Sequence, residues 1–260
     1  MQYEAIIFDW AGTTVDYGCF APVEAFMEIF KEYGITPTME ETRKPMGMLK
    51  WDYIKTMLSM ERIRGEFKRI HGRDFTDKDV DEMHEKFAAS LMKILDRFSD
   101  PKDHVVETVA KLREAGLKIG STTGYTDAMM EIVTKEAAKA GYEPDCWFSP
   151  DSTGHMGRPY PYMIFKNMET LNVTSVDKVM KVGDTLSDIR EGKNAGVFSV
   201  GIIEGSSEMG LTKAEYEALS PEEKEARVQE VTKRYMDAGA DAVVQDIRGV
   251  LELIGQASRV

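Results

Sequence analysis

The chain has 260 residues, of which 42% are hydrophobic and 30% are charged, and its formal net charge at pH 7 is −12. This length suits one large domain or a core with a sizeable insertion, and the composition is that of an ordinary soluble globular protein. The negative charge argues against nucleic acid or an anionic membrane as a partner, because either would be repelled. A small anion needs only a local pocket of positive charge.

The protein is expected to be cytoplasmic. No apolar run approaches the length of a membrane span, and the first residues have neither the basic region nor the apolar region of a secretion signal. The two cysteines, Cys19 and Cys146, are far apart in the chain and lack the spacing of a metal site. We therefore expect two reduced thiols.

The first predicted strand ends abruptly at a carboxylate. Residues 5–8 form an apolar run that is rich in β-branched and aromatic side chains, and Asp9 follows directly. Such a run is typical of a strand buried in the middle of a parallel sheet. The ligand crevice of an open α/β sheet lies beyond the carboxyl ends of its strands, so Asp9 would lie where chemistry usually occurs. The alternative is that Asp9 only caps the turn that begins at Gly12.

Between Val15 and Pro101 the sequence predicts helices and no strand. Thr38 and Glu41 have the spacing of a capping box for a short helix. Apolar residues recur at helical spacing over residues 22–33, 48–60, 61–70 and 77–98. A block of helices after the first strand of an α/β pattern indicates a separate helical domain inserted into the core.

After Pro101 the alternation of strands and helices returns. The predicted strands cover residues 117–121, 146–148, 178–184, 197–203 and 242–244. The predicted helices cover residues 104–115, 127–140, 162–171, 212–236 and 247–254. This alternation predicts an α/β core built on a parallel sheet.

Four stretches with reactive side chains lie at or near the ends of these strands. They are Asp9–Thr14, Thr122–Gly124, Arg158 with its neighbours, and Asp184–Asp188. Taken singly, each fits a commoner structural role: a turn, a turn, a surface arginine and a helix cap. Taken in order, they make one site for phosphoryl chemistry, with a hydroxyl and amides for phosphate oxygens, a cation to neutralise them and acids for Mg²⁺. Asp9 suits the nucleophile, because an aspartyl-phosphate is readily hydrolysed.

This ordered set resembles the haloacid dehalogenase superfamily, whose core is a Rossmann-like sheet with a helical cap inserted after the first motif. Within it, the chain is most similar to the phosphonatase family, the phosphonoacetaldehyde hydrolases. The likeness covers nearly the whole chain, and the stretches that carry it are residues 8–22, 43–47, 50, 119–125, 157–159 and 182–184. The resemblance implies a catalytic core of residues 1–16 and 102–260 and a cap domain of residues 17–101.

Two positions in this resemblance bear on the reaction. Many relatives carry a second aspartate two residues after the nucleophile, as the general acid for a departing alkoxide, whereas this chain has Ala11. Breaking a carbon–phosphorus bond leaves electron density on carbon, and a lysine imine on the adjacent aldehyde can accept it as an enamine forms. The resemblance implies that Lys50, kept partly neutral by burial and nearby positive charge, forms this imine. Without the resemblance, Lys50 is one more solvated cation.

The resemblance also implies the remaining members of the site. Mg²⁺ would be held by Asp9, the main-chain carbonyl of Ala11 and Asp184, with Asp188 in support. The groups that bind phosphonate oxygens would be Thr123, with Thr122 as the alternative, Gly124 and Arg158. The side chains between cap and core would be Met46, Cys19 and Tyr125, unless Met46 only packs.

One residue departs from the family pattern. Members of the family carry a histidine three residues after the imine lysine, thought to move protons, and this chain has Tyr53. A tyrosine, with a reference pKa of about 10, is a poor base at neutral pH. A bound water or another residue then has to move the proton, or turnover is slow, or the substrate differs. The simplest alternative is that Tyr53 only packs in the cap.

The expected function is hydrolysis of the carbon–phosphorus bond of phosphonoacetaldehyde, with Mg²⁺ as cofactor. The expected partners are a small phosphonate substrate and, by the resemblance, a second subunit in a homodimer. The first alternative is a Mg²⁺-dependent phosphatase of the same superfamily that acts on a small phosphate ester, against which Ala11 counts. The second is a non-catalytic phosphate-binding or scaffold protein, which the combination of Asp9, Lys50 and Asp184 disfavours.

Overall fold

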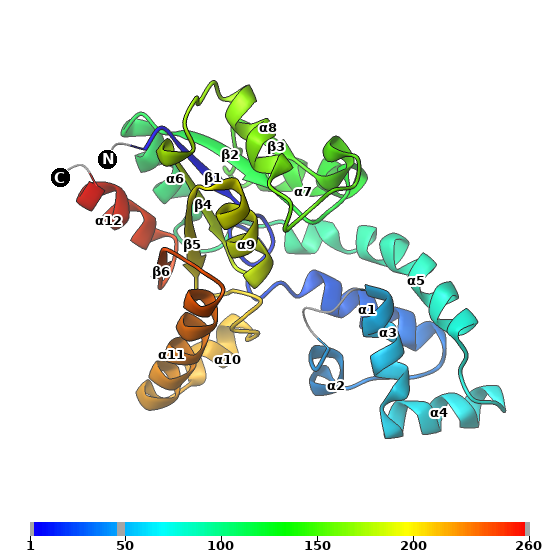
Figure 1. The fold of residues 1–260 in the computed structure, drawn as a ribbon. Coiled ribbons are helices and arrows are strands. Elements are labelled where there is room, and N and C mark those ends of the chain that lie inside the picture. The colour runs from blue at the N-terminus through cyan, green and yellow to red at the C-terminus, as the bar shows by residue number, and fades with distance from the viewer. Residues whose placement is uncertain (1–2, 46–49, 258–260) are drawn as a thin grey trace. The chain divides into compact units, whose positions relative to one another are not determined.

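The computed structural model describes residues 3–45 and 50–257, and these form two compact units. The first unit consists of Met1–Cys19 and Ser99–Val260, and the second consists of Phe20–Phe98. We call them the sheet unit and the helical unit, and each is described by itself (Figure 1). Met46 is outside the described residues.

The sheet unit is built on six parallel strands in the order β3-β2-β1-β4-β5-β6. The strands are β1 (Ala5–Phe8), β2 (Lys118–Thr122), β3 (Cys146–Phe148), β4 (Val179–Gly183), β5 (Phe198–Ile202) and β6 (Ala242–Val244). This confirms the predicted parallel α/β fold. β1 lies in the middle, where Ile7 is in register with Gly120 of β2 and with Lys181 of β4. Every residue of β1 is fully buried, as its apolar sequence predicts.

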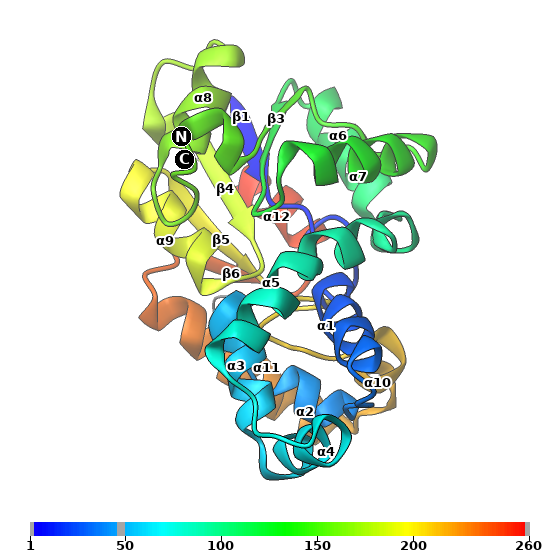
Figure 2. The same ribbon diagram turned by 90° about the vertical axis from the view of Figure 1, so that its right-hand side faces the viewer.

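Helices cover both faces of this sheet (Figure 2). α8 (Tyr162–Thr170) and α9 (Leu186–Ala195) pack against each other and against the central strands on one face. α6 (Val105–Glu114) and α12 (Arg248–Ala257) pack together on the other. The other α-helices described in the unit are α7 (Asp127–Lys139), α10 (Lys213–Ala218) and α11 (Pro221–Asp237), and its short 3₁₀ helices are η2 (Pro150–Thr153) and η3 (Val176–Lys178). With a helix layer on each face, the carboxyl ends of the strands are the edge at which a ligand can be bound.

The helical unit has its elements near the predicted positions. They are α1 (Ala21–Glu32), α2 (Met39–Arg43), α3 (Lys50–Ser59), α4 (Glu61–His71), α5 (Asp77–Met92) and a short 3₁₀ helix, η1 (Leu95–Phe98). Thr38 and Glu41 form the predicted capping box of α2.

The predicted helix over residues 77–98 is wrong at its end, because α5 stops at Met92. The side chain of Asp96 accepts a hydrogen bond from the main-chain N–H of Arg97 at 3.0 Å. A local bond of this kind competes with the helical pattern and favours a turn. The 3₁₀ turn still buries Leu95, which explains why the apolar spacing suggested a longer helix.

Two segments of the sheet unit lead to the helical unit and back. The chain leaves after Cys19 and returns at Ser99. Within the sheet unit, Val15 and Pro101 form an antiparallel bridge, so these two segments lie side by side. Among the described residues, we find no helix with both the length and the apolar character that a bilayer crossing requires.

Candidate active site

Asp9 follows β1 directly and lies at the carboxyl end of the central strand. Its main-chain N–H donates to the carbonyl of Val182 at 2.9 Å, so it continues the pairing of β1 with β4. The side chain is 4% exposed. Arg158 Nη2 donates to Asp9 Oδ1 at 2.5 Å, and Thr13 Oγ1 donates to Oδ2 at 3.3 Å. A buried carboxylate held by a guanidinium and a hydroxyl is preorganised, with its charge compensated.

The turn after Asp9 brings the backbone close to a second carboxylate. Gly12 has a φ of +84°, and a Cβ at this position would overlap the carboxylate of Asp184. Glycine therefore satisfies both the backbone conformation and the space that this turn allows. Thr13 Oγ1 also lies 3.4 Å from Asp184 Oδ1, and Thr14 Oγ1 donates to the carbonyl of Asp9 at 3.0 Å. The turn after Asp9 thus contacts the carboxylates of both Asp9 and Asp184.

Three buried carboxylates converge beyond this turn. Asp9, Asp184 and Asp188 each offer an oxygen within 4.8 Å of the others. Burial, and then the charges of Asp9 and Asp188, raise the pKa of Asp184 well above its usual value, although Ser207 donates to its Oδ2 from Oγ at 2.6 Å and from N at 2.7 Å. A divalent cation would relieve this repulsion, and it prefers oxygen ligands. The cluster therefore fits Mg²⁺, and Ala11 belongs to the same turn.

Asp188 keeps its charge for a different reason. Burial favours its neutral form, but Arg158 and Lys181 together hold its pKa below the usual value. Its Oδ2 accepts from Thr185 Oγ1 at 2.6 Å, and these two residues form the capping box at the start of α9. Asp188 therefore caps α9, as its sequence position suggests, and is also a member of the acidic cluster.

Arg158 is the cation at the centre of the site. Its side chain is 11% exposed and forms ion pairs from three different nitrogens. Besides Asp9, the partners are Asp188 Oδ1 at 3.1 Å and Glu191 Oε2 at 3.0 Å. Burial works against its charge, but these three carboxylates raise the pKa of Arg158 well above its usual value. The surface arginine that its sequence position allows is not found.

Two buried residues of the site were missed in the sequence. Lys181 of β4 is 1% exposed, and its Nζ lies 3.0 Å from Asp188 Oδ1 and 3.3 Å from Glu191 Oε2. Glu191 of α9 is completely buried. A signal for both was present, because a lysine inside an apolar strand needs a buried partner. Glu191 follows Asp188 by three residues and so lies on the same face of the helix.

Thr122 and Thr123 differ in how their hydroxyls are used. Thr122 Oγ1 accepts from Lys181 Nζ at 2.7 Å and from Arg158 Nη2 at 2.9 Å, and donates to Glu191 Oε2 at 3.1 Å. A hydroxyl has one donor and two acceptor sites, so these bonds use its full capacity. Thr123 Oγ1 accepts from the main-chain N–H of Tyr125 at 3.0 Å, which uses one acceptor site.

Three further residues of the expected site belong to the sheet unit. Gly124 and Tyr125 follow β2, and Cys19 ends the first segment of the unit. The hydroxyl of Tyr125 is buried and has no hydrogen-bond partner among the described residues. Burial, and then the nearby Cys19, Asp16 and Asp9, raise its pKa well above the usual value. Cys19 carries a half-buried, reduced thiol. Gly124 is exposed, with open space around the position of a Cβ, so its φ and packing do not explain a glycine there.

Lys50 is the first residue of α3 in the helical unit and is exposed. Its ammonium lies over the rings of Phe26 and Phe87, 5.9 Å and 5.6 Å from their centroids. Within the helical unit, Lys50 therefore makes cation–π contacts with two aromatic rings. Lys50 and Asp9 belong to different units.

Tyr53 lies one turn further along α3 and faces the interior of the helical unit. It is 3% exposed and stacks on Phe26, with the ring centroids 3.9 Å apart. Its hydroxyl donates to the carbonyl of Thr42. These contacts are those of a packing residue with a satisfied hydroxyl, which agrees with the simplest alternative at this position.

Comparisons with known proteins identify the family of this chain. A family model described as haloacid dehalogenase-like hydrolase matches residues 3–196. The phosphonoacetaldehyde hydrolase of Lysinibacillus sphaericus is 52% identical, with 98% of this chain and 94% of that protein covered. The phosphonoacetaldehyde hydrolase of Bacillus cytotoxicus is 50% identical, with 98% and 96% covered. A crystal structure of a phosphonoacetaldehyde hydrolase-like protein from Oleispira antarctica matches with a TM-score of 0.84 at 36% identity, covering 100% of this chain and 94% of the other. The chain therefore belongs to the haloacid dehalogenase-like hydrolases and, within them, to the phosphonoacetaldehyde hydrolase family.

Proposed function

We propose that this chain hydrolyses the carbon–phosphorus bond of phosphonoacetaldehyde and releases acetaldehyde and orthophosphate. The observation that carries the proposal is the buried Asp9, which is held by Arg158 at the carboxyl end of the central strand, with alanine at the position of the general acid. This arrangement offers a nucleophile and a phosphonate-binding cation but no proton donor for an alkoxide. The family relationship reported above supports the same substrate.

Asp9 would act as the nucleophile. Its carboxylate attacks phosphorus, the carbon–phosphorus bond breaks, and the bonding electrons leave with carbon. Water then cleaves the aspartyl-phosphate and returns the free carboxylate with orthophosphate. Arg158 lies 2.5 Å from the Asp9 side chain, so a phosphonate that pairs with the guanidinium would be next to the attacking oxygen.

Lys50 would supply the electron sink. Its neutral amine condenses with the aldehyde and releases water, and the protonated imine accepts the electron pair from the breaking bond as an enamine forms. Protonation at carbon and hydrolysis of the imine release acetaldehyde and restore the amine. Because the hydroxyl of Tyr53 already donates to Thr42, we assign the proton transfers to water or to another group rather than to Tyr53.

Asp9, the carbonyl of Ala11 and Asp184, with Asp188 in support, would hold Mg²⁺. When bound, this ion lowers the repulsion between the carboxylate and the phosphonate. The close approach of the three buried carboxylates and the raised pKa of Asp184, caused by burial and by Asp9, support this assignment.

Thr123, Gly124 and Arg158 would bind the phosphonate oxygens. The bonds of Thr122 favour Thr123 for this role, because a fully used hydroxyl can contact a ligand only by giving up a buried partner. Tyr125 and Cys19 would line the substrate side of the site, where the unpaired Tyr125 hydroxyl can donate to a bound ligand.

The proposal includes a homodimer and a cytoplasmic location. Four large apolar side chains on and just before α8 are between 41% and 53% exposed: Met156, Tyr160, Tyr162 and Phe165. The rings of Tyr160 and Tyr162 are stacked. An exposed apolar cluster of this kind suits a contact with a second subunit.

Product analysis tests the proposed reaction. The protein is incubated with Mg²⁺ and phosphonoacetaldehyde, and orthophosphate and acetaldehyde are measured together. We expect equal amounts of both products, and loss of both with Lys50→Ala. If Lys50→Ala keeps the wild-type rate on small phosphate esters and the wild type does not cleave the phosphonate, the chain is a phosphatase.

A further inference from the structure

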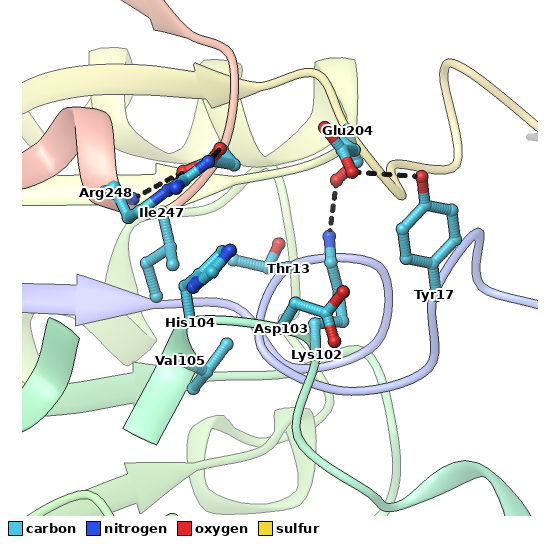
Figure 3. A pocket seen from close by; sticks show the side chains of 10 residues that line it. Thr13, Tyr17, Lys102, Asp103, His104, Val105, Glu204, Ile247 and Arg248 are labelled. Atoms are coloured by element: carbon cyan, nitrogen blue, oxygen red, sulfur yellow. Dashed lines mark hydrogen bonds and ion pairs between the residues drawn. The ribbon is translucent and has the colours of Figure 1, made fainter. Parts of the chain in front are cut away.

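Lys102 lies behind the turn that follows Asp9 and binds two main-chain carbonyls. Its Nζ donates to the carbonyl of Gly12 at 2.6 Å. It also donates to the carbonyl of Glu204 at 2.7 Å (Figure 3). Burial lowers the pKa of Lys102 to about 8, against the charges of Asp184, Glu204, Asp16 and Asp246, which favour the ammonium. A buried ammonium carries a desolvation cost, which hydrogen bonds and nearby opposite charges have to offset.

The same lysine lies where three segments of the sheet unit meet. Its own N–H donates to the carbonyl of Thr14 at 2.8 Å, beside the bridge between Val15 and Pro101. The main-chain N–H of Gly18 donates to the carbonyl of Gly205 at 2.7 Å. Lys102 belongs to the segment that returns from the helical unit. It connects this segment with the loop after β5 and with the stretch that contains the turn after Asp9 and leads to the helical unit.

Gly205 makes this approach possible. Its φ is +70°, and a Cβ there would come within 2.8 Å of Lys102 Nζ and of the ring of Tyr17. Tyr17 in turn lies under the ammonium, 5.5 Å from its ring centroid, and its hydroxyl contacts Glu204 Oε1 at 3.5 Å. Figure 3 shows Lys102 and Tyr17 both directed at Glu204. Residues of the loop after β5 therefore pack closely against the side chain of Lys102.

We propose that Lys102 is a positioning residue for the reaction at Asp9. Its ammonium fixes the Gly12 carbonyl, and Gly12 in turn is packed against the Asp184 carboxylate with no space for a Cβ. A shift of Gly12 therefore moves Asp184, Thr13 or both relative to Asp9. This inference rests on the proposed function, because it assigns Asp9 and Asp184 to the reacting site.

A pocket beside Lys102 gives the means to test this. Thr13, Tyr17, Lys102 and Glu204 are among its lining residues. Truncation of Lys102 to alanine removes three carbons and the nitrogen. A propylammonium ion has this composition and can reach the vacated place through the pocket.

The first experiment compares Lys102→Ala with Lys118→Ala. Lys118 Nζ also donates to a main-chain carbonyl, that of Leu171 at 2.5 Å, but Lys118 begins β2 and so lies at the opposite end of its strand from the site. We expect Lys102→Ala to lower kcat/KM by about 100-fold, mostly through kcat, and Lys118→Ala by less than about threefold. Propylammonium should restore at least about tenfold to Lys102→Ala, whereas propanol should not.

The second experiment does not depend on the substrate. Hydrogen–deuterium exchange of peptides over residues 10–18 is compared in the wild type, Lys102→Ala and Lys102→Met, with a peptide over residues 198–202 of β5 as the internal reference. We expect faster exchange at 10–18, with β5 unchanged, and slower exchange again with propylammonium. If the wild type fails to cleave phosphonoacetaldehyde but the exchange changes as expected, only the proposed function fails.

Two results would overturn the inference. The first is unchanged exchange at residues 10–18 together with unchanged kcat/KM in Lys102→Ala. The second is an increase of exchange in all peptides of both Lys102 variants without recovery in propylammonium, which assigns Lys102 to general stability.

Discussion

The buried ion network of the sheet unit differs from two ion pairs of the helical unit in the exposure of its cations. In the sheet unit, Arg158 and Lys181 are buried together with the carboxylates that they contact. In the helical unit, Arg62 pairs with Glu41 and Arg73 pairs with Asp79, and both arginine side chains are about half exposed. Surface pairs contribute little to stability, whereas buried charges carry a large desolvation cost. Burial therefore supports the proposed reacting site in the sheet unit, whereas Lys50, the proposed imine lysine of the helical unit, is exposed.

The largest effect is expected at the buried nucleophile. Asp9→Asn should lower kcat by about 10⁴-fold, because the amide cannot form the aspartyl-phosphate. Asp103→Asn is the matched control, since Asp103 is an exposed aspartate of the same unit that pairs with Lys213. Steady-state kinetics with circular dichroism on both variants measures the effect. A variant of Asp9 that keeps more than a tenth of the activity contradicts its role.

A second large effect is expected at the exposed lysine. Lys50→Arg keeps the positive charge near the two aromatic rings but cannot form the imine, so cleavage of phosphonoacetaldehyde should fall by about 10³-fold. Lys55→Arg is the control, because Lys55 belongs to the same helix and lies over the ring of Trp51, 4.8 Å from its centroid. Equal losses in the two variants, measured by acetaldehyde release, would refute a special role for Lys50.

A smaller loss is expected when the buried ion network is unbalanced. Lys181→Met leaves Asp188 and Glu191 with Arg158 as their remaining cation among these contacts, so we expect kcat/KM to fall by about 100-fold and stability by about 3 kcal/mol.

The double variant Lys181→Met with Glu191→Gln removes one charge of each sign. It should recover about 1 kcal/mol of stability relative to Lys181→Met, measured by urea unfolding. Additive losses would show that the two residues act independently.

Opposite pH dependences are expected in the two units. Burial, and then Asp9 and Asp188, raise the pKa of Asp184, so without metal the folded state binds a proton that the unfolded state has already lost. Without metal, the stability of the fold should then fall as pH rises from the usual pKa of an aspartate to the raised pKa of Asp184. Mg²⁺ displaces the proton, so it should stabilise the fold more at pH 8 than at pH 5.5. Thermal unfolding with and without Mg²⁺ at both pH values measures this, and Asp184→Asn should abolish the difference.

In the helical unit, the hydrogen bond from Arg62 lowers the pKa of Glu41 to about 2. The folded state here releases its proton more readily than the unfolded state, so the stabilisation is complete above the ordinary range of a glutamate and is lost as pH falls toward 2. Glu41→Gln should reduce the acid sensitivity of α2, measured by exchange of its amides between pH 5 and pH 3. A change in the opposite direction contradicts the ion pair.

The smallest effect is expected at Tyr53. Tyr53→Phe keeps the stacking on Phe26 and removes the hydrogen bond to Thr42, so kcat should change by less than about threefold and stability by about 1 kcal/mol. A loss of kcat of more than about tenfold with unchanged stability would instead assign the hydroxyl to proton transfer.

Much of the sheet unit could be predicted from general rules. An apolar run that ends at Asp9 and another that ends at Asp184 imply buried parallel strands, and carboxyl ends of neighbouring strands meet at one edge. β1 and β4 are indeed neighbours, and their terminal carboxylates converge. The family likewise follows from the order of these motifs, and the comparisons confirm it.

Other features depend on information that these rules do not contain. The predicted strand ended at Ser121, whereas β2 extends to Thr122, and successive side chains of a strand point to opposite faces. A one-residue error in the strand end was therefore enough to leave Thr122 and Thr123 unresolved. Lys181 was overlooked because it lies inside its strand, where no ligand site was expected, although its charge alone required a buried partner. For Lys50 only the resemblance indicates catalysis, since the sequence around it does not distinguish it from a solvated lysine.

The most direct test of the central claim is to trap the imine. Borohydride is added to the protein with phosphonoacetaldehyde and Mg²⁺, and the modified peptide is identified by mass spectrometry. We expect a substrate-dependent label on Lys50, carrying an ethyl group in the wild type after bond cleavage and a phosphonoethyl group in Asp9→Asn. Release of orthophosphate from phosphonoacetaldehyde without a label on Lys50, or with the label spread over Lys55 and other lysines, would contradict it.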